Sequence, residues 1–128
     1  MRLDVISGSF SILKLPAGQP MPVWASDSEF LSLTRTLEEL SLVVDSNSVP
    51  EGEPLKVDAG WRGFRVAGTL DFSLTGVLSS IAAPLAKKKV SIFAISTFDT
   101  DYVLVKEDKM EEALRALSES GFIIKDKA

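Results

Sequence analysis

Two apolar stretches in the second half of the chain flank a short polar connection. Val90 to Ile95 and Tyr102 to Val105 are rich in β-branched and aromatic residues, and Ser96 to Asp101 between them reads Ser-Thr-Phe-Asp-Thr-Asp. This pattern predicts a β-hairpin with a polar bend. Because the bend carries two carboxylates, three hydroxyls and an aromatic ring, we expect a small polar ligand to bind there.

Apolar residues at helical spacing predict a helix before this hairpin. They are Leu74, Val77, Leu78, Ile81, Ala82 and Leu85. Asp71 and Ser73 precede the stripe and are candidate N-caps. Pro84 lies within it and should kink the helix or end it early.

A second helix is predicted after the hairpin, with its buried stripe at Met110, Ala113, Leu114 and Leu117. Asp108 and Glu111 have capping-box spacing, and Gly121 is a natural stop. With strands at Trp61 to Ala67 and Phe122 to Ile124, residues 60–128 follow the order β-α-β-β-α-β. This order predicts an α+β, ferredoxin-like unit, in which a four-stranded antiparallel sheet carries both helices on one face.

The first half, residues 1–59, is expected to be a degenerate copy of this unit. Ile6 to Leu15 reads as a strand, and the prolines that follow leave room for no more than a short turn of helix at Val23 to Ala25. Glu29 to Arg35 and Leu40 to Asp45 alternate as a second hairpin. The hairpin of residues 29–45 resembles that of residues 90–105 in pattern. A proline-rich loop takes the place of the first helix of the unit.

Composition narrows the possible functions. The chain has 128 residues, 45% of them hydrophobic, a net charge of −4, and neither His nor Cys. The acidic balance argues against nucleic acid and membrane as partners. Without His and Cys, thiolate and Ser-His catalysis and imidazole metal sites are excluded, so we expect no catalytic residues, metal or cofactor, and a protein that is not an enzyme. No segment approaches the roughly 20 apolar residues of a membrane span, and the first residues do not resemble a secretory signal, so we expect a cytoplasmic protein.

Three segments carry a resemblance to a known family. They are Gly68 to Leu78 (GTLDFSLTGVL), Ala83 to Ala86 (APLA) and Ser96 to Val105 (STFDTDYVLV). Together they resemble the ACT-domain family, and more narrowly the small bacterial tandem-ACT proteins, whose pattern is shared by the eukaryotic cytosolic arginine sensor and the regulatory domains of aspartate kinases. The resemblance is close over residues 60–121 and implies two tandem ACT units, of which the first is degenerate.

The resemblance also implies a function, which is amino-acid binding at an interface between ACT units. The residues that match the ligand-binding part of the family are Thr75, Gly76, Val77, Thr97, Phe98, Asp99 and Asp101. The first three would present backbone groups to a carboxylate at a helix start. Asp101, more than Asp99, would accept an ammonium or guanidinium group. Leu74 departs from an acidic residue of the arginine sensor's pattern, which argues against selectivity for arginine.

Each of these residues also has a purely structural interpretation. Gly76 could serve tight packing of helix on sheet, and Asp99 and Asp101 could be turn formers that bond their own backbone. Phe98 could line a pocket or lie in a subunit interface. The leading hypothesis is therefore an amino-acid-binding sensor or regulatory protein that forms a homodimer, and the alternative is a dimerisation or interaction module without a ligand.

Overall fold

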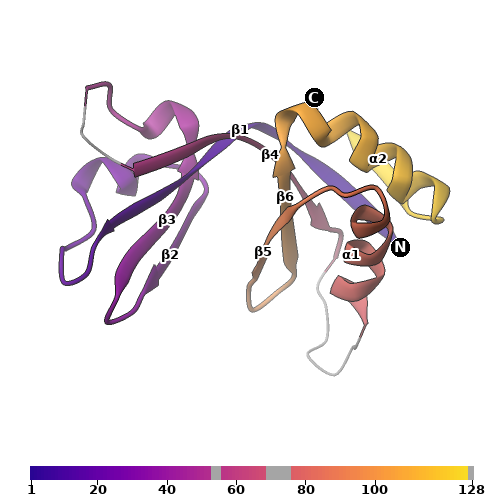
Figure 1. Cartoon of the computed structure of the whole chain (residues 1–128), viewed down its shortest axis with the longest axis horizontal. Coiled ribbons are helices and arrows are strands. Elements are labelled where there is room, and N and C mark those ends of the chain that lie inside the picture. Colours follow the sequence, from indigo (N-terminus) through magenta and orange to yellow (C-terminus); the bar gives the residue numbers. More distant parts are fainter. Residues whose placement is uncertain (53–55, 69–75, 127–128) are drawn as a thin grey trace. The chain divides into compact units, whose positions relative to one another are not determined.

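The chain forms two compact units. The computed structural model describes residues 1–52, 56–68 and 76–126 (Figure 1). The N-terminal unit is Gly8–Trp61, and the C-terminal unit combines Met1–Ser7 with Arg62–Ala128. We expected the division between residues 59 and 60, with the start of the chain in the first half. The structure instead packs Met1–Ser7 with the C-terminal unit.

The described residues form seven strands, two α-helices and three short 3-10 helices. The strands are β1 (Arg2–Pro16), β2 (Leu31–Arg35), β3 (Glu39–Asp45), β4 (Lys56–Val66), β5 (Ile92–Ser96), β6 (Asp101–Lys106) and β7 (Ile123–Asp126). The helices are η1 (Val23–Asp27), η2 (Ser46–Ser48), α1 (Val77–Lys87), η3 (Glu107–Lys109) and α2 (Met110–Glu119). Strands β1 and β4 contribute residues to both units.

The sheet of the C-terminal unit has the strand order β7-β1-β4-β6-β5. The hairpin of β5 and β6 is antiparallel with Ser96 opposite Asp101, which confirms its prediction. The expected four-stranded, wholly antiparallel sheet is wrong in one respect, because the start of β1 lies between β4 and β7 and runs parallel to β7. Leu3 and Val5 alternate there and are buried, so this segment buries one side against the same core.

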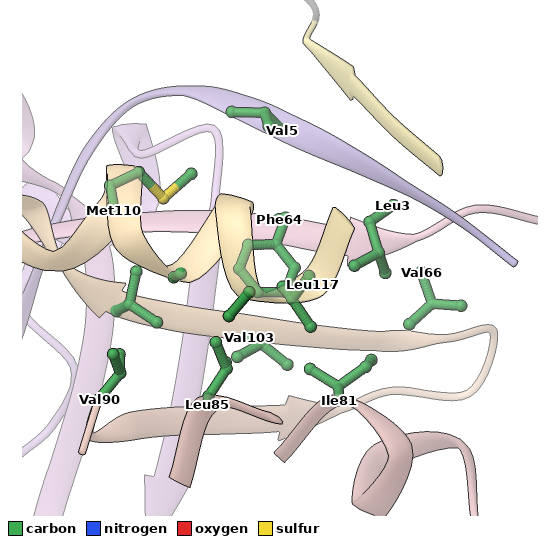
Figure 2. Close-up of a cluster of buried hydrophobic side chains, with 13 residues drawn as sticks. Leu3, Val5, Phe64, Val66, Ile81, Leu85, Val90, Val103, Met110 and Leu117 are labelled. Carbon is green, nitrogen blue, oxygen red and sulfur yellow. The ribbon is translucent and has the colours of Figure 1, made fainter. Parts of the chain in front are cut away.

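Both helices pack on one face of this sheet. The hydrophobic core of the C-terminal unit contains residues of β1, β4, β6, α1 and α2. Figure 2 shows its side chains between the helices and the strands. Its strand members are Leu3, Val5, Phe64, Val66, Val103 and Val105. Because they occupy alternate positions of their strands, they point to the same side of the sheet.

Helix α1 begins later than the sequence suggested. Its N-cap is Gly76, in a left-handed conformation, and not Asp71 or Ser73, which lie outside the described residues. Pro84 is inside the helix, yet the helix continues to Lys87, so an early stop was wrong. Leu85 is fully buried, and its packing holds the last turn in place, while the carbonyl of exposed Ser80, four residues before the proline, can bond to water.

Helix α2 is preceded directly by the 3-10 turn η3. Its N-cap is therefore Lys109, without a side-chain capping bond, and the expected capping box from Asp108 to Glu111 is wrong. Its buried side was predicted correctly, since Met110, Ala113 and Leu117 all belong to the core. Gly121 follows the helix with a φ of 101°, which confirms it as the stop.

The N-terminal unit contains a second, smaller core. β3 pairs with both β1 and β2 in antiparallel fashion, and η1 is the short turn of helix that the proline-rich sequence allowed. The buried side chains of this core are Leu13, Leu15, Ala25, Leu40, Leu42 and Val44. Half-buried Trp24 packs against them, as a cover for this core.

The two hairpins repeat each other in detail. In one, Arg35 pairs with Leu40 across the turn, and in the other Ser96 pairs with Asp101. A 3-10 turn follows each second strand. Thr36 and Thr97 each donate their backbone N–H to the carbonyl three residues later, both at 2.9 Å. The similarity noted in the sequence therefore corresponds to the same hairpin geometry, with Thr36 equivalent to Thr97.

Candidate functional site

The polar bend is a tight turn closed by Thr97. The backbone N–H of Thr97 donates to the carbonyl of Thr100 at 2.9 Å. Its hydroxyl also donates to that carbonyl at 2.9 Å and accepts from the N–H of Thr100 at 3.3 Å. Thr97 was expected to contact the ligand, but its hydroxyl is already hydrogen-bonded within the turn.

The aromatic and acidic residues of the bend differ in exposure. Phe98 is 80% exposed, Asp99 is exposed and Asp101 is half-buried at the first position of β6. Within residues 1–52, 56–68 and 76–126, neither carboxylate makes a hydrogen bond or an ion pair. Thr97, and not the aspartates, therefore supplies the side-chain bonds of the turn, which removes the main structural interpretation of Asp101.

The start of α1 supplies the second group of expected site residues. The N-cap Gly76 has φ 78° and makes no side-chain capping bond, and the first helical bond runs from the N–H of Ser80 to its carbonyl at 2.9 Å. The N–H groups of Val77, Leu78 and Ser79, the first three residues of α1, therefore take no part in the hydrogen bonds of the helix. The side chain of Val77 packs on the core, which leaves only its backbone for a ligand. Thr75 lies outside the described residues.

The space around Gly76 distinguishes its two interpretations. A Cβ built on this residue would have no heavy atom within 4 Å. Tight helix packing therefore does not explain the glycine. Its positive φ does, because side chains other than glycine rarely adopt this conformation.

Thr100 is the residue of the bend that the sequence analysis did not single out. It is 2% exposed, and its hydroxyl donates to the carbonyl of Val66 at 2.8 Å. Val66 ends β4, and from there the chain continues towards α1. A threonine between two aspartates carries no sequence signal of burial, so only the packing of the hairpin on β4 identifies it.

These contacts place the bend at the end of the sheet where the chain leaves β4 for α1. Figure 1 shows the β5–β6 turn and the first turn of α1 at the same end of the C-terminal unit. The structure thus brings Phe98, Asp99 and Asp101 together on one turn. Gly76 and Val77 form a separate group at the helix start, and residues 69–75 between β4 and α1 are not described.

Two properties of the described part of the chain bear on other classes of site. No group of three or more acidic side chains there is arranged to hold a metal ion. None of the helices described is both long and apolar enough to cross a membrane.

Comparison with known families divides the chain at nearly the same place as the structure does. A model of the ACT domain matches residues 56–119, which is half of the chain. A separate model, for the N-terminal domain of a group of similar proteins, matches residues 8–52. The N-terminal unit therefore has its own sequence pattern.

Two human proteins are similar in sequence. CASTOR3P is 34% identical over 107 residues, which cover 75% of this chain and 66% of that protein. The cytosolic arginine sensor for mTORC1 subunit 1 is 32% identical over 110 residues, which cover 79% of this chain and 33% of the sensor. The chain thus spans just under two thirds of the first relative and one third of the second.

Solved structures extend the similarity to the whole chain. Protein Atu0741 from Agrobacterium tumefaciens has a TM-score of 0.91 at 34% identity, covering 99% of this chain and 93% of that one. The regulatory subunit of aspartate kinase from Thermus thermophilus has a TM-score of 0.68 at 12% identity, covering 94% and 97%, a likeness of fold alone. With the ACT-domain model matched over half of its length, the chain belongs to the ACT-domain family.

Proposed function

We propose that this protein is a regulatory ACT protein that binds a free amino acid at the bend of β5 and β6 and the start of α1. The observation that carries the proposal is the pair of unlike binding groups in the C-terminal unit. One is a helix start with backbone donors. The other is a bend with half-buried Asp101, whose carboxylate has no partner among the described residues. An amino acid has one group that suits each of them.

The carboxylate of the ligand is assigned to the backbone of Gly76 and Val77, together with Thr75. Backbone N–H groups at a helix start and the positive end of the helix dipole attract anions. α1 has 11 residues, enough for the dipole to matter. Because a Cβ on Gly76 would meet no heavy atom of the described residues beyond its chain neighbours within 4 Å, we expect a ligand to approach its backbone.

The cationic group of the ligand is assigned to Asp101. A half-buried carboxylate next to a ligand ammonium or guanidinium group forms a charge-assisted hydrogen bond, which is stronger than a neutral one. Phe98 precedes it by three residues and supplies an apolar surface, while exposed Asp99 contributes less. The reverse orientation would place the ligand carboxylate beside two aspartates and is disfavoured.

The assembly that completes this site is proposed to be a homodimer of tandem ACT units. The repeated hairpin geometry supports a degenerate ACT-like copy within the N-terminal unit, and the resemblance implies ligands at interfaces between such units. Phe98, 80% exposed on the single chain, would then be covered by the second chain or by the ligand. The arginine sensor is related by sequence, but Leu74 replaces an acidic residue of its pattern, so we expect a ligand other than arginine to bind best.

A thermal-shift screen of the twenty standard amino acids tests this function. A ligand at about 100 times its Kd stabilises the folded protein by about 2.7 kcal/mol. For a chain of this size the melting temperature should then rise by roughly 5 °C or more. If no amino acid shifts it at millimolar concentration, the protein is an interaction module without a ligand.

A further inference from the structure

The last peptide unit of β4 is held from both sides. On one side, the N–H of Ala67 donates to the carbonyl of Arg2 in β1 at 3.0 Å. On the other, the carbonyl of Val66 accepts from the hydroxyl of Thr100 at 2.8 Å. β4 lies between β1 and β6 in the sheet, and β6 begins at Asp101. Thr100, one residue earlier, therefore adds one more hydrogen bond between the two chain segments. The donor of this bond is a side-chain hydroxyl and not a backbone N–H.

All polar groups of Thr100 are used inside the protein. Its N–H donates to the hydroxyl of Thr97 at 3.3 Å, and its carbonyl accepts from the same threonine. Its hydroxyl is committed to Val66. Because Thr100 is 2% exposed, it does not face a ligand. It fastens the bend to the end of β4.

The equivalent position of the other hairpin lacks this fastening. Glu39 is the counterpart of Thr100, since both accept the turn bond from Thr36 and Thr97 respectively. Glu39 is half-buried, and a carboxylate cannot donate a bond of this kind at neutral pH. The hydroxyl contact is therefore specific to the hairpin of the C-terminal unit, the one that also has a complete helix α1.

We infer that Thr100 is the positioning residue of the amino-acid site, an inference that rests on the proposed function. It lies between Phe98 and Asp101 and fixes both relative to Val66, from which the chain runs on to Gly76. One buried hydrogen bond thus holds the part of the site assigned to the cationic group of the ligand, Asp101 with Phe98, in register with the end of β4. Without it, the bend keeps its own turn but loses its register with β4.

The test compares Thr100→Val, which keeps the shape and removes the hydroxyl, with Thr100→Ser, which keeps the hydroxyl. The matched control is Ser11→Ala in the N-terminal unit, which removes another buried hydroxyl, bonded to Ser46 at 2.8 Å. Each variant of the full chain is titrated calorimetrically with the twenty standard amino acids, well below its melting temperature. Amide hydrogen exchange, measured by NMR without ligand, provides a second readout. The amide of Ala67 belongs to the peptide unit that accepts from Thr100 and reports the end of β4, whereas the amide of Thr97 reports the turn alone.

We expect Thr100→Val to weaken amino-acid binding roughly tenfold, the scale of one buried hydrogen bond, and to lose amide protection at Ala67, while Thr97 keeps its protection because the turn itself is retained. Thr100→Ser should restore the affinity and the protection of Ala67. Ser11→Ala should lower the melting temperature and leave affinity unchanged. If wild type binds and Thr100→Val binds equally well, the positioning role is wrong and the proposed function stands. If wild type binds no amino acid, the proposed function fails and the positioning role fails with it.

Discussion

At the scale of the residue, Gly76 is explained by backbone conformation and not by packing. Its φ is 78°, and a Cβ at this position would meet nothing within 4 Å. Gly76→Ala should therefore lower the free energy of unfolding by about 1 to 2 kcal/mol, the cost of a left-handed conformation for an ordinary residue. Urea denaturation measures it, and Gly76→Asn should lower it less, because asparagine adopts this conformation more readily. Equal stability of all three proteins would contradict this explanation.

The site residues could be predicted from the sequence only in part. Phe98, Asp99 and Asp101 were correctly placed in a bend between two strands, because a polar segment between two β-rich runs has few other structures available. The engagement of the Thr97 hydroxyl and the burial of Thr100 could not be predicted. Both depend on which atoms of the turn face each other and on β4, a strand more than thirty residues earlier in the chain.

At the scale of the element, α1 contains a proline that its packing tolerates. Pro84 removes the bond that an ordinary residue would donate to Ser80, and an interior proline destabilises a helix by about 3 kcal/mol relative to alanine. Pro84→Ala should therefore raise the free energy of unfolding by about 1 kcal/mol or more, after loss of the ring's own contacts. Chemical denaturation checks this. Pro16→Ala, at the end of β1, is the control and should produce no such gain, whereas a destabilised Pro84→Ala would show that packing of the ring dominates.

Element types were easier to predict than element ends. Periodicity identified both hairpins, both helices and the buried sides of α2, because burial of apolar side chains dictates these patterns. The helix starts were wrong, since α1 begins at a left-handed glycine and α2 continues directly from η3. The insertion of β1 beside β7 was missed because Leu3 and Val5 form too short an alternation to specify their partner strand.

At the scale of the whole molecule, we predict a homodimer. In the single chain, the Phe98 residue is 80% exposed. ACT units commonly cover such exposed apolar side chains by association. Light scattering at a concentration on the order of tens of micromolar should give twice the mass of one chain, since specific dimers persist at that concentration. A measured mass equal to that of one chain at this concentration would contradict the prediction.

The central claim is that an amino acid binds with its cationic group at Asp101, and calorimetric titration tests it most directly. The amino acid giving the largest thermal shift is titrated into wild type, Asp101→Asn and the matched control Asp99→Asn. Asp101→Asn should weaken binding by about 2 kcal/mol or more, the scale for one partner of a buried charged pair, with the fold retained. Asp99→Asn should change it little. Equal affinity of wild type and Asp101→Asn, or no heat with any amino acid at millimolar concentration, would contradict the claim.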